Sequence, residues 1–438
     1  MTTVLGSSSA GTAGSAASGD LLRRRALTLG THSPLFYDSP LAVRSASGVW
    51  LTSMDGVTYL DGYNNVPHVG HCHPYVVEAV HQQAKELNIH TRYLNDRVLD
   101  YAEQLLATFD QPLARLFLTN SGSEANELAL RIARQHTGST GVLVTDFSYH
   151  GNTTSLAELT TALPVREPLG AHVRALTVPD LDHENDAEEA VLARSLAQVD
   201  AAIASLQEEG HGLSALLFDP LFSTEGLPRL PRGYVTAVVE RVRAAGGLVV
   251  ADEVQSGFGR VGTCMWGHQI FEMVPDFVTL GKPMGNGHPM GGVITTAELL
   301  DEFGSNNLYF NTFAGNPVSA AAGLAVLKVM KAEQLADNAQ STGQLLRDNL
   351  AELADRHDFL GAAKGAGLFT GLEFVDAATG APAPALAKQV VEAMLGRQVL
   401  ISRIGRSDNM LKIRPPLPFT GKHVDILTDR LADCLAQL

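Results

Sequence analysis

Short apolar runs that alternate with helical patterns are the feature of this chain that most limits its fold. The runs lie at residues 113–119, 141–147, 213–220, 247–253 and 276–281. Helical patterns separate them, for example GYVTAVVERVRAAG from Gly233. Strands that are apolar on both faces and joined by helices form a parallel sheet with helices on each side. The central region is therefore predicted to be α/β.

A change of texture after residue 317 predicts a second domain, as does the length of 438 residues, which exceeds one comfortable hydrophobic core. Ala/Leu-rich helical patterns at 318–356 and 384–396 precede strand-like pieces, GLFTGLEF and NMLKIRPP, so this part should be α+β. The predicted divisions are an N-terminal segment that joins the small domain (20–74), a large domain (75–317) and a C-terminal small domain (318–438).

The first 19 residues are rich in Ser, Gly and Ala, lack acidic residues and precede an arginine triplet at 23–25. A disordered arm is the simpler interpretation, although a transit peptide shares these traits. No apolar run approaches the ~20 residues needed to span a bilayer. Three widely spaced cysteines give neither a disulfide framework nor a zinc site. We therefore expect a cytoplasmic protein without a membrane partner or a metal ion.

The charge balance argues against nucleic acid as a partner. Lys and Arg number 32 against 47 Asp and Glu, which gives a formal charge of -15, and the basic residues form no long stripe. The acidic tract at 179–190 is expected to be a solvated loop that enters a helix.

One lysine stands alone in TLGKPMGNGHPMGG, among glycines, prolines and apolar residues. A buried ammonium group requires a partner, loses its charge or takes part in chemistry, so Lys282 is either a salt-bridge residue or a nucleophile. Ligands of open parallel sheets bind at the carboxyl ends of the strands. Asp252 and Lys282 each follow an apolar run, so an acid and an amine could point into one cleft.

Pyridoxal phosphate requires such a pair. Its aldehyde needs an amine for a Schiff base, its ring nitrogen needs a carboxylate, and its phosphate needs N–H and hydroxyl donors. Ser121, Gly122 and Ser123 in SGSEAN lead into a helix whose N-terminus favours an anion. An ordinary helix cap would look similar, and Tyr149, which could cover the ring, could equally lie in the core or on the surface.

From about residue 20 to the C-terminus, the chain resembles the class III pyridoxal phosphate-dependent aminotransferases. The motifs NSGSEAN, YHG, ADEVQSGFGR, LGKPMGNGHPMGG and NTFAGNP occur in the order found in that family. The resemblance implies the fold of the aspartate aminotransferase superfamily, the PLP-dependent transferase fold (fold type I), with a mainly parallel sheet in the large domain. It also implies pyridoxal 5′-phosphate as the cofactor and a homodimer with active sites at the subunit interface.

The resemblance further implies roles for single residues. Lys282 would form the Schiff base and act as the general base, and Asp252 would bind the ring nitrogen. Val254 and Tyr149 would cover the two ring faces, and Thr312 would reach in from the second subunit. The residues expected to bind the cofactor are Ser121, Gly122, Ser123, Tyr149, His150, Asp252, Val254, Gln255, Lys282 and Thr312.

The substrate side departs from the common pattern. Many family members have an arginine that grips a carboxylate where this chain has Lys412, and the arginine stands at Arg414 instead. A lysine cannot form the planar bidentate fork that suits a carboxylate. Asp219 and Phe222 also replace a common glutamate and glutamine. The phrases YNNVPHVGHCHPYVVEAV, LNIHTRYLND and GKPMGNGHPM are similar to the phospho-lyase subgroup, which eliminates phosphate from phosphorylated amines.

The predicted function is therefore elimination of phosphate from a phosphorylated primary amine, with O-phosphoethanolamine giving acetaldehyde, ammonia and phosphate. An ω-aminotransferase with a keto-acid acceptor is the main alternative, and it would use the same catalytic residues. A catalytically inactive binding protein on this fold is a third, against which Lys282, Asp252 and Thr312 together argue. The residues expected to bind the substrate are Tyr37, Asn65, His68, Arg92, Arg403, Arg406, Lys412 and Arg414.

Overall fold

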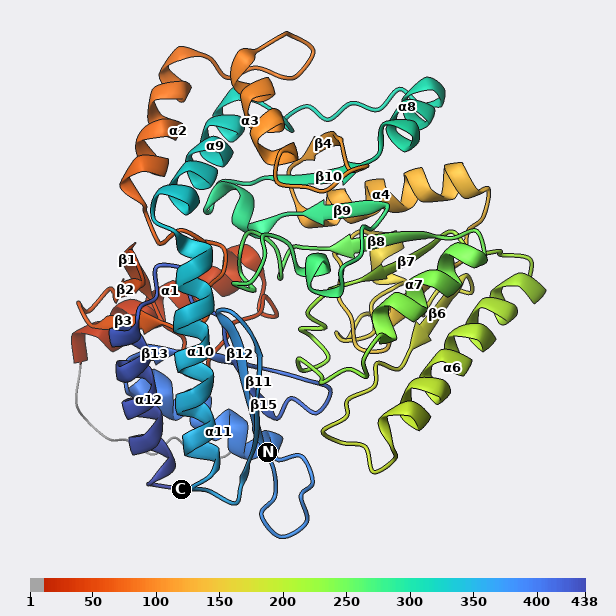
Figure 1. Cartoon of the computed structure of the whole chain (residues 1–438). Coiled ribbons are helices and arrows are strands. Elements are labelled where there is room, and N and C mark those ends of the chain that lie inside the picture. Colours follow the sequence, from red (N-terminus) through yellow and green to blue (C-terminus); the bar gives the residue numbers. More distant parts are fainter. Residues whose placement is uncertain (1–11) are drawn as a thin grey trace.

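The computed structural model describes the chain from residue 12 to residue 438, and its side chains from residue 18. Residues 1–11 of the expected disordered arm lie outside the described residues. The rest of that segment begins helix α1 (Thr12–Leu29). Figure 1 shows a large central sheet with helices on both sides and a smaller region that contains both termini of the described chain.

The central sheet has seven strands in the order β4-β10-β9-β8-β7-β5-β6. Strands β5 to β9 pair in parallel, and β10 is antiparallel to both β4 and β9. This pairing confirms the prediction of a mainly parallel sheet. Each predicted apolar run contains one strand. The strands are β4 (Arg115–Thr119), β5 (Val142–Thr145), β6 (Val173–Leu176), β7 (Ala215–Phe218), β8 (Leu248–Asp252), β9 (Phe277–Leu280) and β10 (Gly291–Thr295).

The two faces of this sheet bury different side chains. In β5, Val142 and Val144 pack into a cluster with α4, whereas Leu143 points to the opposite cluster, with α6 and α7. This alternation explains why the strands are apolar throughout. The helices between residues 74 and 306 are α2 (Pro74–Glu86), α3 (Asp96–Leu106), α4 (Gly122–Thr137), α5 (Thr154–Ala157), α6 (Glu188–Glu208), α7 (Tyr234–Ala244) and α8 (Ala297–Asn306), with short helices η1 (Gly267–Phe271) and η2 (Lys282–Gly285).

Two four-stranded sheets form the smaller region. In the first, with the order β1-β2-β3-β13, the C-terminal strand β13 pairs in parallel with β3 and so connects the two ends of the chain. The second has the order β11-β12-β15-β14. The strands are β1 (Val43–Ser47), β2 (Trp50–Ser53), β3 (Thr58–Asp61), β11 (Leu360–Ala366), β12 (Phe369–Phe374), β13 (Val399–Leu400), β14 (Ser402–Ile404) and β15 (Met410–Ile413).

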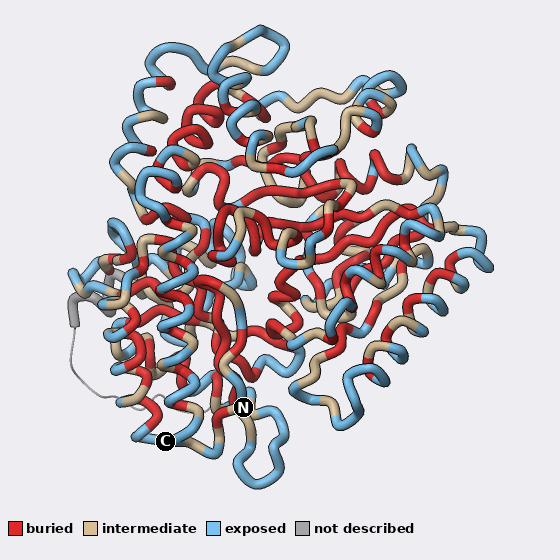
Figure 2. Tube along the Cα trace, in the orientation of Figure 1, coloured by how far each residue is buried: buried red, intermediate tan, exposed pale blue. Residues whose placement is uncertain are grey.

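Four helices complete the C-terminal part: α9 (Pro317–Ala332), α10 (Leu335–Ala354), α11 (Pro384–Gly396) and α12 (Gly421–Leu435). The pattern at 318–356 therefore contains two helices, which separate at Gln334, a residue with a left-handed φ of 51°. Buried residues concentrate in the central sheet and in the strands of the smaller region (Figure 2). Among the described helices, none combines the length and the apolar character needed to cross a bilayer.

The acidic tract at 179–190 is a loop that enters α6, as predicted, but it is not simply solvated. Asp180 and Asp182 form ion pairs with Lys364 of β11 at 2.7 and 3.0 Å. The loop therefore connects the segment after β6 to the second four-stranded sheet. A sequence pattern did not reveal this contact because Lys364 lies more than 180 positions away.

Candidate active site

Loops at the carboxyl ends of the central strands enclose a cavity of about 330 Å³. Strand β9 leads to Lys282, β8 to Asp252, and β5 to Tyr149 and His150. The loop after β4 contributes the start of α4. These residues come from four segments that are distant in sequence, and all of them line the same cavity. The cavity is also lined by Gly122, Ser123, Asp219, Val254 and Gln255.

One wall of the cavity is the N-terminus of α4. Ser121 caps this helix, because its hydroxyl accepts a 3.2 Å hydrogen bond from the N–H of Glu124. A Cβ atom on Gly122 would lie only 2.9 Å from Cγ2 of Val254, so glycine permits the close approach of these two segments. The free N–H groups and the dipole of α4 favour an anion here.

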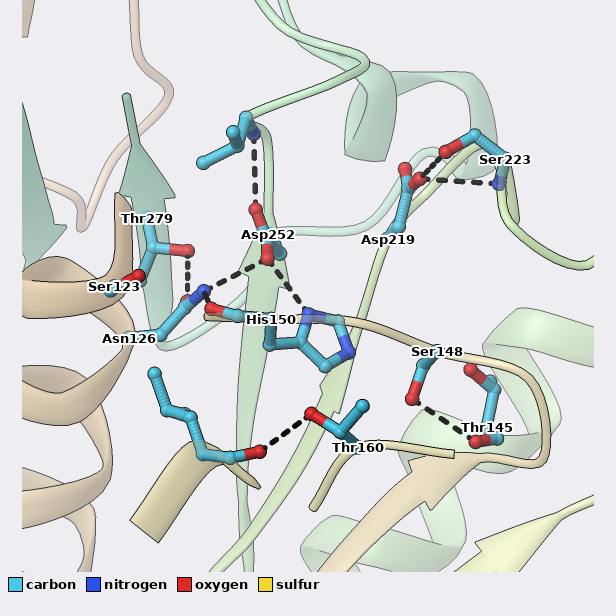
Figure 3. A network of polar contacts seen from close by, with 12 residues as sticks. Ser123, Asn126, Thr145, Ser148, His150, Thr160, Asp219, Ser223, Asp252 and Thr279 are labelled. Carbon is cyan, nitrogen blue, oxygen red and sulfur yellow. Dashed lines mark hydrogen bonds and ion pairs between the residues drawn. The ribbon is translucent and has the colours of Figure 1, made fainter. Parts of the chain in front are cut away.

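Asp252 is fixed by three hydrogen bonds (Figure 3). Its Oδ2 accepts from Nδ1 of His150 at 2.7 Å and from Nδ2 of Asn126 at 2.9 Å, and its Oδ1 accepts from the N–H of Val254 at 3.1 Å. Thr279 in turn donates to Oδ1 of Asn126 at 2.5 Å, which sets the orientation of that amide. The carboxylate is thus buried and held in one orientation before any ligand binds.

Lys282 begins the short helix η2 and reaches solvent through the cavity. Among the described residues, its amine has no hydrogen-bond or ion-pair partner. The enclosing protein lowers the pKa of Lys282 by desolvation, and the positive charge of Arg414 lowers it further, against the opposing effect of Asp252 and Asp219. A neutral amine, which is the nucleophilic form, is therefore easier to form here than in water.

Gln255 connects the cavity to residues behind it. Its Oε1 accepts hydrogen bonds from Nη1 of Arg414 and from Nδ2 of Asn65, the latter at 3.2 Å. Arg414 is only 3% exposed, and its guanidinium also lies 3.4 Å from the carbonyl oxygen of Tyr63. The structure thus brings two predicted substrate residues, Asn65 and Arg414, to Gln255 rather than to the cavity wall.

Lys412 lies on β15 near the aromatic rings of Phe369 and Tyr63. Its Nζ is 5.5 Å from the ring centroid of Phe369 and 6.0 Å from that of Tyr63, and it has no hydrogen-bond or ion-pair partner among the described residues. Burial lowers its pKa strongly, and the charges of Arg414 and Lys282 lower it further. These effects favour the neutral amine of Lys412, and a bound anion would favour its charged form. Among the described residues, no acidic side chain forms an ion pair with Lys412, which lies close to Lys282 but not in the lining of the cavity.

Asp219, which lines the cavity, accepts hydrogen bonds from its own loop. Its Oδ1 accepts from the N–H of Leu221 at 2.9 Å, and its Oδ2 accepts from the N–H of Ser223 at 3.1 Å and from the hydroxyl of Ser223. Burial raises the pKa of Asp219 to about 6, and the nearby charge of Asp252 adds to this effect. No ion pair joins Asp219 to Lys412 among the described residues.

Two predicted substrate residues have structural partners away from the cavity. His68 is completely buried, donates from Nε2 to the carbonyl oxygen of Phe258 at 2.6 Å and accepts from Arg260 at Nδ1. Its burial lowers its pKa to about 3, so it is neutral. The hydroxyl of Tyr37 donates to the carbonyl oxygen of Ile401 at 3.1 Å.

The three remaining predicted arginines also have other partners. Arg403 forms an ion pair with Asp408 at 2.5 Å, and Arg406 pairs with Asp146. Arg92 lies over the ring of Phe310, 3.6 Å from its centroid. The structure does not bring these side chains to the lining of the cavity.

Thr312 lies outside the lining of this cavity, on an exposed segment. Its neighbours Leu308 and Phe313 are 98% and 73% exposed. Tyr93 and Leu94 are also largely exposed, at 60% and 99%. Large apolar side chains exposed at this level are typical of a surface that another molecule covers.

The sequence-based prediction missed Asn126 and Thr279, which complete the network around Asp252. A signal for Asn126 was present, because this polar residue falls on the buried face of the amphipathic helix α4, between Ala125 and Leu128. A buried amide must be hydrogen-bonded, which predicts polar partners for Asn126 at the nearest strand ends. Thr279 lies within β9 and gave no such signal.

The fold and the cavity define the family. Residues 36–435 match the aminotransferase class-III family, and the chain belongs to it. Its fold is the PLP-dependent transferase fold, and its cofactor is pyridoxal 5′-phosphate. The residues present fit this group, because an unpartnered lysine, an oriented carboxylate and a helix N-terminus with free donors line one cavity.

Particular relatives are closely similar over nearly the whole chain. A solved phospholyase from Arthrobacter in complex with phosphoethanolamine is 62% identical, with a TM-score of 0.94, and the match covers 96% of this chain and 100% of that chain. The ethanolamine-phosphate phospho-lyase homolog 1 of Caenorhabditis elegans is 37% identical, with 92% and 91% coverage. The alanine–glyoxylate aminotransferase 2-like protein of Drosophila melanogaster is also 37% identical, with 95% and 87% coverage.

Proposed function

We propose that this protein is a phospho-lyase that eliminates phosphate from O-phosphoethanolamine. The observation that carries the proposal is a group of basic side chains beside the cavity that lack a carboxylate partner. Among the described residues, Lys282, Lys412 and Arg414 have no carboxylate in ion-pair contact, whereas Asp219 and Asp252 accept hydrogen bonds from other donors. A dianionic phosphate would supply the missing negative charge.

The similarity to relatives supports the same substrate class. The solved Arthrobacter phospholyase is in complex with phosphoethanolamine, and its identity of 62% extends over almost all of this chain. We therefore take a small phosphorylated primary amine as the substrate.

Pyridoxal 5′-phosphate, when bound, supplies an electron sink that makes the carbon next to a substrate amine acidic. We assign Ser121, Gly122 and Ser123 to its phosphate. Tyr149 and Val254 would cover its ring. The remaining contacts that we propose within one subunit are those of His150, Asp252, Gln255 and Lys282.

Lys282 would hold the cofactor and, once a substrate has displaced it, take the proton from the amine-bearing carbon as general base. Asp252 would keep a proton at the ring nitrogen. Lys412 would stabilise the negative charge on the departing phosphate oxygens. Over the whole reaction, phosphoethanolamine and water give acetaldehyde, ammonia and phosphate, so no oxidant or reductant is needed.

The decisive experiment uses the purified holoenzyme with phosphoethanolamine and no keto acid. We expect equal amounts of phosphate and acetaldehyde over many turnovers. Ethanolamine as the substrate and Lys282→Ala as the enzyme are the controls, and neither should give acetaldehyde. Turnover that occurs only after a keto acid or an aldehyde is added would contradict the proposal.

That contrary outcome would favour an ω-aminotransferase, the second candidate function. The Drosophila relative is named an aminotransferase, and the general base would be the same Lys282. Lys412 separates the candidates. In the lyase, Lys412→Met should raise the KM for phosphoethanolamine by about ten- to a hundredfold, because a charge-assisted hydrogen bond is lost. Arg403→Met is the matched control, since Arg403 pairs with Asp408.

A homodimer is part of the proposal. The exposed apolar side chains near Thr312 support it, namely Tyr93, Leu94, Leu308 and Phe313. A second copy that covers them could receive Thr312 beside the phosphate of its own cofactor. The unpaired cysteines Cys72, Cys264 and Cys434 suit the reducing cytoplasm, where we place the enzyme.

A further inference from the structure

We propose that Lys412, in β15, and Arg414, just after β15, have different roles. Arg414 is a positioning residue for Gln255, and of the two only Lys412 contacts the substrate phosphate. The proposal for Lys412 rests on the proposed function, but that for Arg414 concerns the cofactor site itself. Sequence alone had grouped both residues on the substrate, because positions 412 and 414 point to the same face of a strand.

The hydrogen bonds of Gln255 determine which way its amide faces. Its Oε1 accepts from two donors, Nη1 of Arg414 and Nδ2 of Asn65. The reversed amide would place its NH₂ group against both donors, so this orientation is the only one that satisfies them. The Nε2 group then remains as a donor without a partner among the described residues, on a side chain that lines the cavity.

Each of the three nitrogens of Arg414 already donates, which uses three of its five N–H groups. One nitrogen donates to Gln255, and the others lie 3.4 Å from the carbonyl oxygen of Tyr63, while the side chain is almost completely buried. Arg414 does not line the cavity, so its buried guanidinium would have to turn away from Gln255 to reach a phosphate there. Asn65 would then be the only donor to Oε1 of Gln255. Arg414 is thus committed to orienting the Nε2 donor of Gln255.

Lys412 differs from Arg414 in each of these respects. It is only half-buried, its amine has no hydrogen-bond partner among the described residues, and its four-carbon stem is flexible. Both cations lie over the ring of Phe369, Lys412 at 5.5 Å and Arg414 at 5.3 Å from its centroid, so the rings do not distinguish them and the hydrogen bonds do. An incoming anion would favour the ammonium form of Lys412, and the three N–H donors of that group would then be available to it.

The first test measures the cofactor without substrate. The variants are Arg414→Gln, Gln255→Leu, their double mutant and Lys412→Met. We expect Arg414→Gln and Gln255→Leu to weaken pyridoxal 5′-phosphate binding by about three- to tenfold and to shift the pH dependence of its visible absorption in the same direction. The double mutant should be no worse than Gln255→Leu, because the arginine acts through the amide.

The second test titrates the holoenzyme with inorganic phosphate. Lys412→Met should weaken phosphate binding by about tenfold or more, with cofactor absorption unchanged, whereas Arg414→Gln should weaken phosphate binding by less than about threefold. Asn65→Ala removes the other donor to Gln255, so it gives a smaller cofactor shift and replaces Arg414→Gln if that variant does not fold.

The inference is overturned if Arg414→Gln leaves the cofactor readouts unchanged, if it weakens phosphate binding as much as Lys412→Met, or if its effect adds fully to that of Gln255→Leu. A wild-type enzyme that releases no phosphate from phosphoethanolamine would overturn the proposed function instead. The cofactor measurements use no substrate, so they would still decide the role of Arg414.

Discussion

The imidazole of His150 donates a 2.7 Å hydrogen bond from Nδ1 to Oδ2 of Asp252, and both side chains are almost completely buried. The amide of Asn126 donates to the same oxygen, and the N–H of Val254 donates to the other. A carboxylate that is oriented in advance can stabilise charge without reorganising during the reaction. His150 is therefore a positioning residue for Asp252.

Replacing Asp252 by asparagine keeps its size but removes its charge. We expect Asp252→Asn to reduce kcat by at least about a hundredfold, because the cofactor ring would lose the group that keeps it protonated. His150→Leu should cost less, about tenfold, since Asn126 and Val254 still hold the carboxylate. His136→Leu, which breaks an exposed pair with Glu302, should not change kcat. Equal activity of Asp252→Asn and wild type would exclude the ring-nitrogen role.

The lowered pKa of Lys282 predicts how the apoenzyme takes up its cofactor. Burial and the charge of Arg414 stabilise the neutral amine, so the reactive fraction at a given pH is larger than for a free lysine. The rate of reconstitution with pyridoxal 5′-phosphate should rise with pH and level off below the usual pKa of a lysine. Stopped-flow absorption would measure this profile, and a midpoint at the value of free lysine would contradict the prediction.

His68 predicts a pH dependence of stability. Its pKa is about 3 in the folded protein because of burial, and lies near 6.5 in an unfolded chain. Between these values the unfolded state binds the extra proton, so stability falls as pH falls, by about 1.4 kcal/mol per pH unit. His68→Gln can still accept from Arg260 and donate to Phe258 without this titration. Its unfolding midpoint should drop less between pH 6.5 and 4.5 than that of wild type.

The outline of the fold followed from the sequence because it depends on local patterns. Apolar runs located five central strands, and Ser121 and Gly138 mark the ends of α4. Strand β10 was not predicted, since two of its five residues are glycines, and β6 was not predicted, since Arg174 interrupts its short apolar pattern. The sequences of β6 and β10 indicate a strand only weakly, because pairing with neighbouring strands, rather than their own composition, places them in the sheet.

The candidate site divides in the same way. The structure gathers Lys282, Asp252 and Tyr149 in one cavity, because each follows a strand whose end lies at the same edge of the sheet. The substrate residues could not be separated by sequence, because a basic residue does not reveal its partner. Arg403 pairs with an acid five positions away, but Arg406 pairs with Asp146, 260 positions away.

The ion pairs of Lys364 lead to a prediction of how much the contact between the acidic loop and β11 contributes to stability. The lysine is 5% exposed and pairs with both Asp180 and Asp182. Lys364→Met would leave the partly buried carboxylate of Asp180 without this lysine and Asp182 with Arg229 as its remaining cation. We expect a loss of about 3 kcal/mol in stability. Lys388→Met is the control, because this lysine and its partner Asp38 are largely exposed, and a loss of about 0–1 kcal/mol is expected. Thermal unfolding of both variants measures the difference.

Thr312 provides a test of the shared active site, because two inactive variants can be combined in one dimer. Thr312→Ala and Lys282→Ala should each be nearly inactive, because one lacks a cofactor-phosphate contact and the other lacks the general base. In a hybrid dimer, the intact Lys282 of one subunit would meet the intact Thr312 of the other, which creates one complete site.

An equimolar mixture of the two variants, unfolded and refolded together, should therefore recover about a quarter of the wild-type activity, since half of the random dimers are hybrids with one complete site each. Each variant refolded alone is the control. If Thr312 served the site of its own subunit, no hybrid would contain a complete site and mixing would restore nothing. Light scattering would establish that the mixture is dimeric, so an absence of recovery in a dimeric sample would place Thr312 in its own subunit.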